Sequence, residues 1–153
     1  MTVHHSVQTF PNGMLVPQYY GLWHGQWYVA KGRRRTFMLY VYDSEAPGPE
    51  WSPSPQIDES GNPRYWFLDV PEGELDRLVR VQVTAKWKGN DLGLVQYENG
   101  IVHARVGVDP RQQVKVDRGE IPEIYRLSFG EYVGTFRWEE LEDIQMLEKD
   151  LKK

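Results

Sequence analysis

The residues of this chain that could carry chemistry stand in no catalytic or metal-binding motif. The 153 residues include no cysteine, which excludes disulfides, thiolate metal sites and a cysteine nucleophile. The histidines stand as one adjacent pair, His4 and His5, and as two isolated residues, His24 and His103. None has the His-x-His or His-Glu-x-x-His spacing, and we predict no metal and no cofactor. One alternative is a metal site assembled from His24, His103 and a carboxylate.

Carboxylates and serines are more numerous but give no clearer signal. Adjacent acids such as Asp58-Glu59 and Glu139-Glu140 fall in an expected loop and an expected helix, and a glycosidase pair must face one cleft, which spacing alone does not indicate. No serine stands in a nucleophile-elbow pattern. No glycine-rich loop joins a strand to a helix, as the phosphate fingerprints require. We therefore predict no catalytic residues, and an enzyme with a dispersed site is only a minor alternative.

One stretch, residues 18–42, differs from this background because aromatic and basic side chains are interleaved there. Residues 1–42 hold no Asp or Glu, so the bases of this stretch have no acid near them in sequence. Arginine beside aromatic rings can stack on nucleobases and bind phosphates, or bind carboxylates of an acidic protein surface. The residues concerned are Trp23, Trp27, Tyr28, Lys31, Arg33, Arg34 and Arg35.

This pattern favours a non-catalytic binding or adaptor domain, which would contact a protein or nucleoprotein partner through the basic, aromatic hairpin. A single-stranded nucleic-acid binder is the alternative that uses the same residues. The formal net charge of −4 argues against a dedicated nucleic-acid binder.

Hydrophobic alternation between closely spaced turn residues predicts an all-β, mainly antiparallel chain. Residues 78–87 alternate most clearly, with Trp87 on the buried face. Asn99-Gly100 predicts a two-residue hairpin that sets Tyr97 opposite Val102 and Gln96 opposite His103. Residues 26–30 and 36–42 predict another hairpin, and both faces of its second strand are apolar or aromatic. That second strand is therefore expected to be central and covered on both sides.

We expect one domain over 1–153, a barrel or sandwich of about eight to ten short strands. Residues 43–63 contain five prolines and predict a long acidic loop. Asp109-Pro110 and Asp117-Arg118-Gly119 predict further turns. Residues 138–152 predict an amphipathic C-terminal helix, although Met146 falls outside its apolar stripe. That stripe consists of Trp138, Leu141, Ile144, Leu147 and Leu151.

Gly21-Leu22-Trp23 resembles the Gly-x-Trp of the first strand of lipocalin-like barrels, and Arg137 stands where that family places an arginine across the tryptophan. The resemblance covers four residues and implies a barrel that holds a small ligand. In this alternative the lumen is lined by Arg80, Thr84, His103 and Arg105.

No window approaches the ~18 apolar residues of a membrane helix. The first residues lack a basic region followed by an apolar run. We expect a cytoplasmic protein that makes no membrane contact.

Overall fold

The computed structural model describes residues 1–152 and consists mainly of antiparallel strands. The strands are β1 (Tyr19–Trp23), β2 (Gln26–Gly32), β3 (Thr36–Val41), β4 (Ser52–Pro53), β5 (Trp66–Pro71), β6 (Arg77–Trp87), β7 (Asn90–Glu98), β8 (Ile101–Val106), β9 (Ile124–Ser128), β10 (Glu131–Arg137) and β11 (Glu142–Asp150). One α-helix, α1 (Pro110–Asp117), and two 3₁₀ turns, η1 (Glu72–Glu74) and η2 (Trp138–Glu140), complete the elements.

These strands form one open sheet in the order β4-β5-β3-β2-β1-β6-β7-β8-β10-β9, with β11 paired to β6. The expectation of mainly antiparallel β-structure is confirmed. The expectation of a barrel is wrong for the described residues, because β4 and β9 end the hydrogen-bonded order and do not pair with each other.

The chain divides into two compact units, each built from segments that are distant in sequence. Unit 1 contains Met1–Thr9, Gln18–Val81 and Glu148–Lys153, and unit 2 contains Phe10–Pro17 and Gln82–Leu147. The long strand β6 begins in unit 1 and ends in unit 2.

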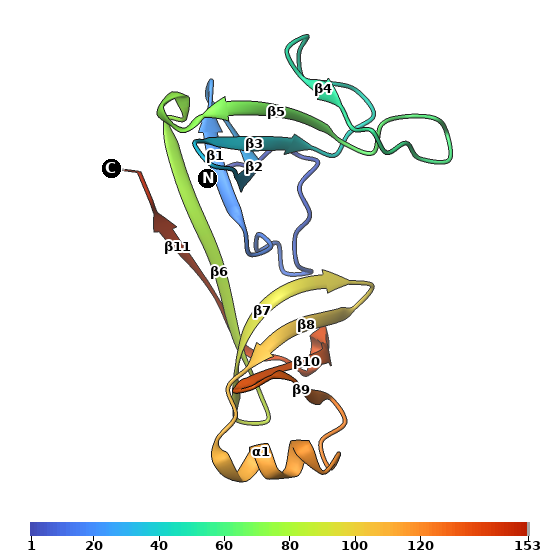
Figure 1. Ribbon diagram of the computed structural model, residues 1–153, viewed down its shortest axis with the longest axis vertical. Coiled ribbons are helices and arrows are strands. Elements are labelled where there is room, and N and C mark those ends of the chain that lie inside the picture. Colours follow the sequence, from blue (N-terminus) through green and yellow to red (C-terminus); the bar gives the residue numbers. More distant parts are fainter. Residues whose placement is uncertain (153) are drawn as a thin grey trace. The chain divides into compact units, whose positions relative to one another are not determined.

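Unit 1 is built on the hairpins β1–β2 and β2–β3, and β3 lies between β2 and β5 (Figure 1). His24 and Gly25 turn the first hairpin with φ of 50° and 79°, as a type I′ turn requires. Leu39 and Val41 of β3 are fully buried in the core of this unit. Trp51 packs on Tyr28, with ring centroids 5.0 Å apart, and so attaches the 43–63 loop to the core. Apart from the short β4, that loop is irregular, as its prolines predict.

Unit 2 follows the register that the sequence predicts. From Val79 onward the residues of β6 alternate between buried and exposed, and Trp87 is 3% exposed. Its ring lies 4.8 Å from that of Phe136, centroid to centroid. Asn99-Gly100 turns β7 into β8, and the predicted pairs Tyr97–Val102 and Gln96–His103 are both present.

The predicted C-terminal helix is wrong, because residues 142–150 form the strand β11 and pair with β6. Ile144 and Met146 are half-buried while their neighbours are exposed, which is the two-residue period of a strand. Leu147, which the helical stripe would bury, is 63% exposed. Backbone pairing with β6 outweighs the local helical pattern, as tertiary context commonly does.

The turns predicted at Asp109-Pro110 and Asp117-Arg118-Gly119 are instead the two ends of the helix α1. The Asp109 carboxylate accepts the backbone N–H of Gln112 at 2.9 Å, and the Gln112 side-chain oxygen accepts the N–H of Asp109 at 3.3 Å. This is a capping box with proline at the first helical position, and Gly119 follows the helix with φ of 76°. These start and stop signals could have identified the helix. None of the helices among residues 1–152 is long and apolar enough to cross a lipid bilayer.

Candidate binding groove

The basic run that the sequence singled out forms the exposed connection between β2 and β3. Arg33, Arg34 and Arg35 are all exposed. The Arg33 backbone N–H donates to the Thr36 carbonyl at 2.8 Å, and the Arg35 carbonyl accepts from Glu72 at 3.3 Å. The predicted hairpin is therefore confirmed, although its turn begins after Gly32 and not at Lys31-Gly32.

The aromatic residues predicted beside these bases serve mainly in packing. Trp27 and Tyr28 are 8% and 7% exposed, and the Arg77 guanidinium lies over the Trp27 ring, 5.4 Å from its centroid. Trp23 is half-buried, and its ring stacks on that of His24 at 3.8 Å. The rings of Trp27 and Tyr28 therefore offer little surface to a partner.

Three tyrosine rings, from Tyr40 of β3, Tyr42 directly after it and Tyr65 directly before β5, form an aromatic cluster at the surface of unit 1. Tyr40 and Tyr42 alternate with the buried Leu39 and Val41, so they project from the other face of the strand. Their rings stack at 6.4 Å, and the Tyr65 ring meets them at 5.5 Å and 6.2 Å. The predicted central position of this strand is confirmed, but its second face is only partly covered, because Met38 and Tyr40 are half-buried and Tyr42, directly after the strand, is 51% exposed.

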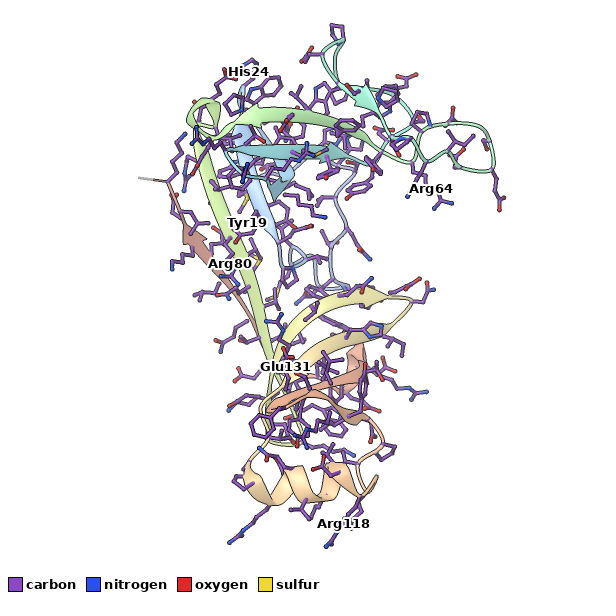
Figure 2. All side chains as sticks on the ribbon, in the orientation of Figure 1. Tyr19, His24, Arg64, Arg80, Arg118 and Glu131 are labelled. Carbon is purple, nitrogen blue, oxygen red and sulfur yellow. The ribbon has the colours of Figure 1, made fainter. Side chains whose placement is uncertain are left out.

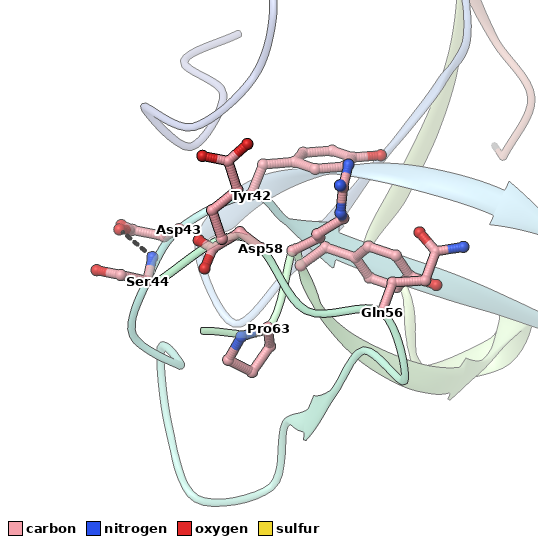
Figure 3. A pocket seen from close by; sticks show the side chains of 9 residues that line it. Tyr42, Asp43, Ser44, Gln56, Asp58 and Pro63 are labelled. Atoms are coloured by element: carbon pink, nitrogen blue, oxygen red, sulfur yellow. Dashed lines mark hydrogen bonds between the residues drawn. The ribbon is translucent and has the colours of Figure 1, made fainter. Parts of the chain in front are cut away.

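These tyrosines line two adjoining hollows that share Tyr42 and Tyr65, which together we call the tyrosine groove. The first hollow, of about 880 Å³, runs along β2 and includes Lys31 in its lining. The second, of about 690 Å³, is bounded by the 43–63 loop and is drawn in Figure 3. Its remaining lining residues are Asp43, Ser44, Gln56, Asp58, Glu59, Pro63 and Arg64.

The loop wall of the groove is held by its own hydrogen bonds. The Asp58 carboxylate accepts the backbone N–H groups of Ser60 and Asn62, both at 2.9 Å. The Ser54 hydroxyl, which is buried, donates to the Gln56 carbonyl at 3.1 Å. Figure 2 shows Arg64 on the connection that enters β5. The acidic, proline-rich segment thus forms a defined side of the groove.

The groove has opposite charges toward its two ends. Lys31 lines the hollow along β2, whereas Asp43, Asp58 and Glu59 line the hollow under the loop, together with Arg64. A hydrogen bond from His5 lowers the pKa of Asp43, so this carboxylate is charged at neutral pH. Burial raises the pKa of Tyr40, as it does for Tyr42.

The residues expected in a barrel lumen lie elsewhere, on exposed positions of the open sheet. Arg80 and Thr84 project from β6, and His103 and Arg105 project from β8; all four are exposed. Within residues 1–152 the sheet does not close, so these side chains enclose no lumen. The ligand-barrel alternative therefore loses the enclosed cavity on which it depends.

The sequence analysis names Lys31 and the arginine hairpin as candidate binding residues, and it does not predict the groove. It placed Tyr40 and Tyr42 on one strand face and expected that face to be covered. Tyr65 follows the 43–63 loop in sequence, and no local pattern indicates that its ring contacts Tyr40 and Tyr42.

Comparison of the sequence and structure with known proteins finds no matching family model, no matching curated protein and no matching solved structure.

Proposed function

We propose that this chain is a non-catalytic binding domain that holds an extended segment of a protein partner in the tyrosine groove, beside the basic β2–β3 hairpin. The observation that carries the proposal is the ring cluster of Tyr40, Tyr42 and Tyr65, in which Tyr40 and Tyr65 are half-buried, Tyr42 is 51% exposed, and all three line an open hollow.

Tyrosine is well suited to such a surface. Its ring provides a large apolar contact area at a small cost in side-chain entropy, and its hydroxyl provides a hydrogen bond. Protein interfaces are enriched in tyrosine, and their energetic centres more so. The mutual stacking of Tyr40, Tyr42 and Tyr65 restricts the rotation of their side chains before a partner binds. The side-chain entropy lost on binding is therefore smaller.

The form of the groove favours an extended chain over a compact small molecule. Its two hollows adjoin through Tyr42 and Tyr65, so the binding surface continues from β2 to the 43–63 loop. Small-molecule sites typically enclose most of the ligand surface, whereas Tyr42 alone is half exposed here.

The charges favour a protein partner over a nucleic acid. A phosphate backbone would meet the carboxylates of Asp43, Asp58 and Glu59 along one half of the groove, and like charges at close range are unfavourable. A peptide with an acidic residue near Lys31 and a basic residue near the loop would complement both ends. The exposed Arg33, Arg34 and Arg35 extend the basic end.

The test is selection of a random peptide library displayed on phage against the purified protein, followed by fluorescence anisotropy with the selected peptides. We expect Tyr42→Ala to weaken binding about tenfold or more, the usual effect of truncating a central interface tyrosine. Charge reversal by Lys31→Glu should weaken the binding of peptides that place an acidic residue in the hollow along β2.

Tyr125→Ala is the matched control, because Tyr125 is 52% exposed on β9 of unit 2 and outside the groove. Peptides that bind Tyr42→Ala as well as the unmodified protein would refute the proposal. A single-stranded oligothymidine that binds instead, with an affinity that falls steeply with salt, would favour the nucleic-acid alternative.

A further inference from the structure

The adjacent histidines near the start of the chain lie beside an aspartate in the segment that follows β3. His5 Nε2 lies 2.8 Å from Asp43 Oδ2, and the rings of His4 and His5 are 4.2 Å apart, centroid to centroid. One possible ligand atom from each of the three residues lies within 4.8 Å of the others. Asp43 is 38 positions from His5 in sequence, so the fold creates the cluster.

Backbone contacts on both sides of the cluster hold its two segments together. The His4 backbone N–H donates to the Trp27 carbonyl at 2.9 Å. The Ser6 hydroxyl accepts the backbone N–H of Tyr42, the residue before Asp43, at 3.0 Å. The His4 ring also stacks on that of the buried Tyr28 at 5.8 Å. The His4 imidazole, whose Nδ1 is also hydrogen-bonded to the Ser6 hydroxyl at 2.9 Å, and the segment that leads to Asp43 are therefore positioned by contacts outside the cluster.

Two imidazoles and one carboxylate form a donor set suited to divalent transition metals. Zn²⁺ is commonly held by such sets, with bonds of about 2.0–2.2 Å to nitrogen and oxygen. In a tetrahedral site this places ligand atoms about 3.3 Å apart, so small side-chain rotations would bring the present cluster to that spacing. Calcium and magnesium prefer all-oxygen sites, which this cluster does not offer.

A simple ion pair does not explain the arrangement as well. His5 is exposed, and an exposed pair with Asp43 contributes little to stability. An ion pair also needs only one imidazole, whereas His4 and His5 each place a possible ligand atom within 4.8 Å of the same carboxylate.

We propose that His4, His5 and Asp43 bind a divalent transition-metal ion such as Zn²⁺, in a three-residue site with an open coordination position. This inference revises the expectation from sequence that the chain has no metal site. It does not depend on the proposed function, although Asp43 also lines the second hollow of the groove.

The test is isothermal titration of the tag-free, chelator-treated protein with Zn²⁺, supported by visible absorption of the Co²⁺ form. We expect one equivalent to bind, with a Co²⁺ spectrum that indicates nitrogen and oxygen ligands. Asp43→Asn preserves the size of the side chain but removes its charge, and His5→Gln removes an imidazole. Each should weaken binding at least about tenfold, since the loss of even an outer-shell partner costs that much.

His24→Gln and Asp58→Asn are the controls, because His24 lies in the β1–β2 turn and Asp58 lies in the 43–63 loop. Both should bind Zn²⁺ as the unmodified protein does. Circular dichroism of every variant separates lost binding from lost folding. The inference is overturned if one equivalent fails to bind, if folded Asp43→Asn binds undiminished, or if His24→Gln weakens binding equally.

Discussion

Gly134, in the middle of β10, is a position where one added methyl group should destabilise unit 2. It pairs with Ala104 of β8 on one side and Ile124 of β9 on the other. A Cβ atom built there would lie 2.6 Å from Phe136 Cζ and 2.7 Å from the Glu123 carbonyl oxygen. Ordinary van der Waals contacts of a Cβ atom lie at 3.4–4 Å, so both neighbours would have to move in the Gly134→Ala variant.

Neither neighbour can move cheaply. Phe136 is 2% exposed and packs on Trp87. The Glu123 carbonyl accepts the Thr135 backbone N–H at 3.1 Å, so its displacement would disturb the entry to β9. Overpacking of a core typically costs about 1–3 kcal/mol, and two rigid contacts place this variant at about 3 kcal/mol. That loss should lower the melting temperature by about 6–12 °C for a chain of this size.

Gly93 of β7 is the matched control, because it is a strand glycine with no atom within 4 Å of an added Cβ. Gly93→Ala should be neutral or stabilising, by up to about 1 kcal/mol, since alanine loses less backbone entropy on folding. Urea unfolding followed by tryptophan fluorescence measures both variants. The steric reasoning is refuted if Gly134→Ala matches the unmodified protein, or if Gly93→Ala loses as much stability.

Two further predictions concern buried rings. Trp87→Ala should lower the free energy of unfolding by about 3–5 kcal/mol, as for other large core side chains, because Trp87 is 3% exposed and its Nε1–H donates to Glu140 at 3.2 Å; a loss below about 1 kcal/mol in urea unfolding would contradict this packing. Burial raises the pKa of Tyr20 from 10.0 to about 12. The neutral Tyr20 hydroxyl therefore contributes fully to the free energy of unfolding below pH 10. That contribution is lost as the pH rises from 10 to about 12, because the unfolded chain releases the proton first. Tyr20→Phe should therefore lose less stability than the unmodified protein between about pH 10 and about pH 12, and parallel urea midpoints over that range would show that Tyr20 does not set this dependence.

Local patterns were sufficient to predict the hairpins and the buried face of β6. Alternation places Val83, Ala85 and Trp87 on one side whatever the strand pairs with. Asn99-Gly100 fixes its own register, because both residues adopt the positive φ of a type I′ turn. The hairpins and the buried face of β6 depend on residues that are neighbours in sequence, so local patterns are enough to predict them.

Features that depend on distant partners were not predicted. Residues 142–150 fit a helical stripe and a strand alternation at once, and pairing with β6 decides between them. The groove requires Tyr65 to meet Tyr40 and Tyr42, and the metal cluster requires Asp43 to meet the histidines. Each of these contacts joins segments that are distant in sequence and that only the fold brings together.

The interleaved make-up of the two units constrains the order in which the chain can fold during synthesis. When Val81 has left the ribosome, unit 1 still lacks the segment that begins at Glu148. At that stage unit 2 has only Phe10–Pro17, whose buried Phe10 must wait for Trp138, the ring on which it stacks at 5.4 Å. Contacts between such distant segments form slowly, because a long loop must close before they contribute. Neither unit can be completed early, and neither can be transferred to another protein as one uninterrupted stretch of sequence.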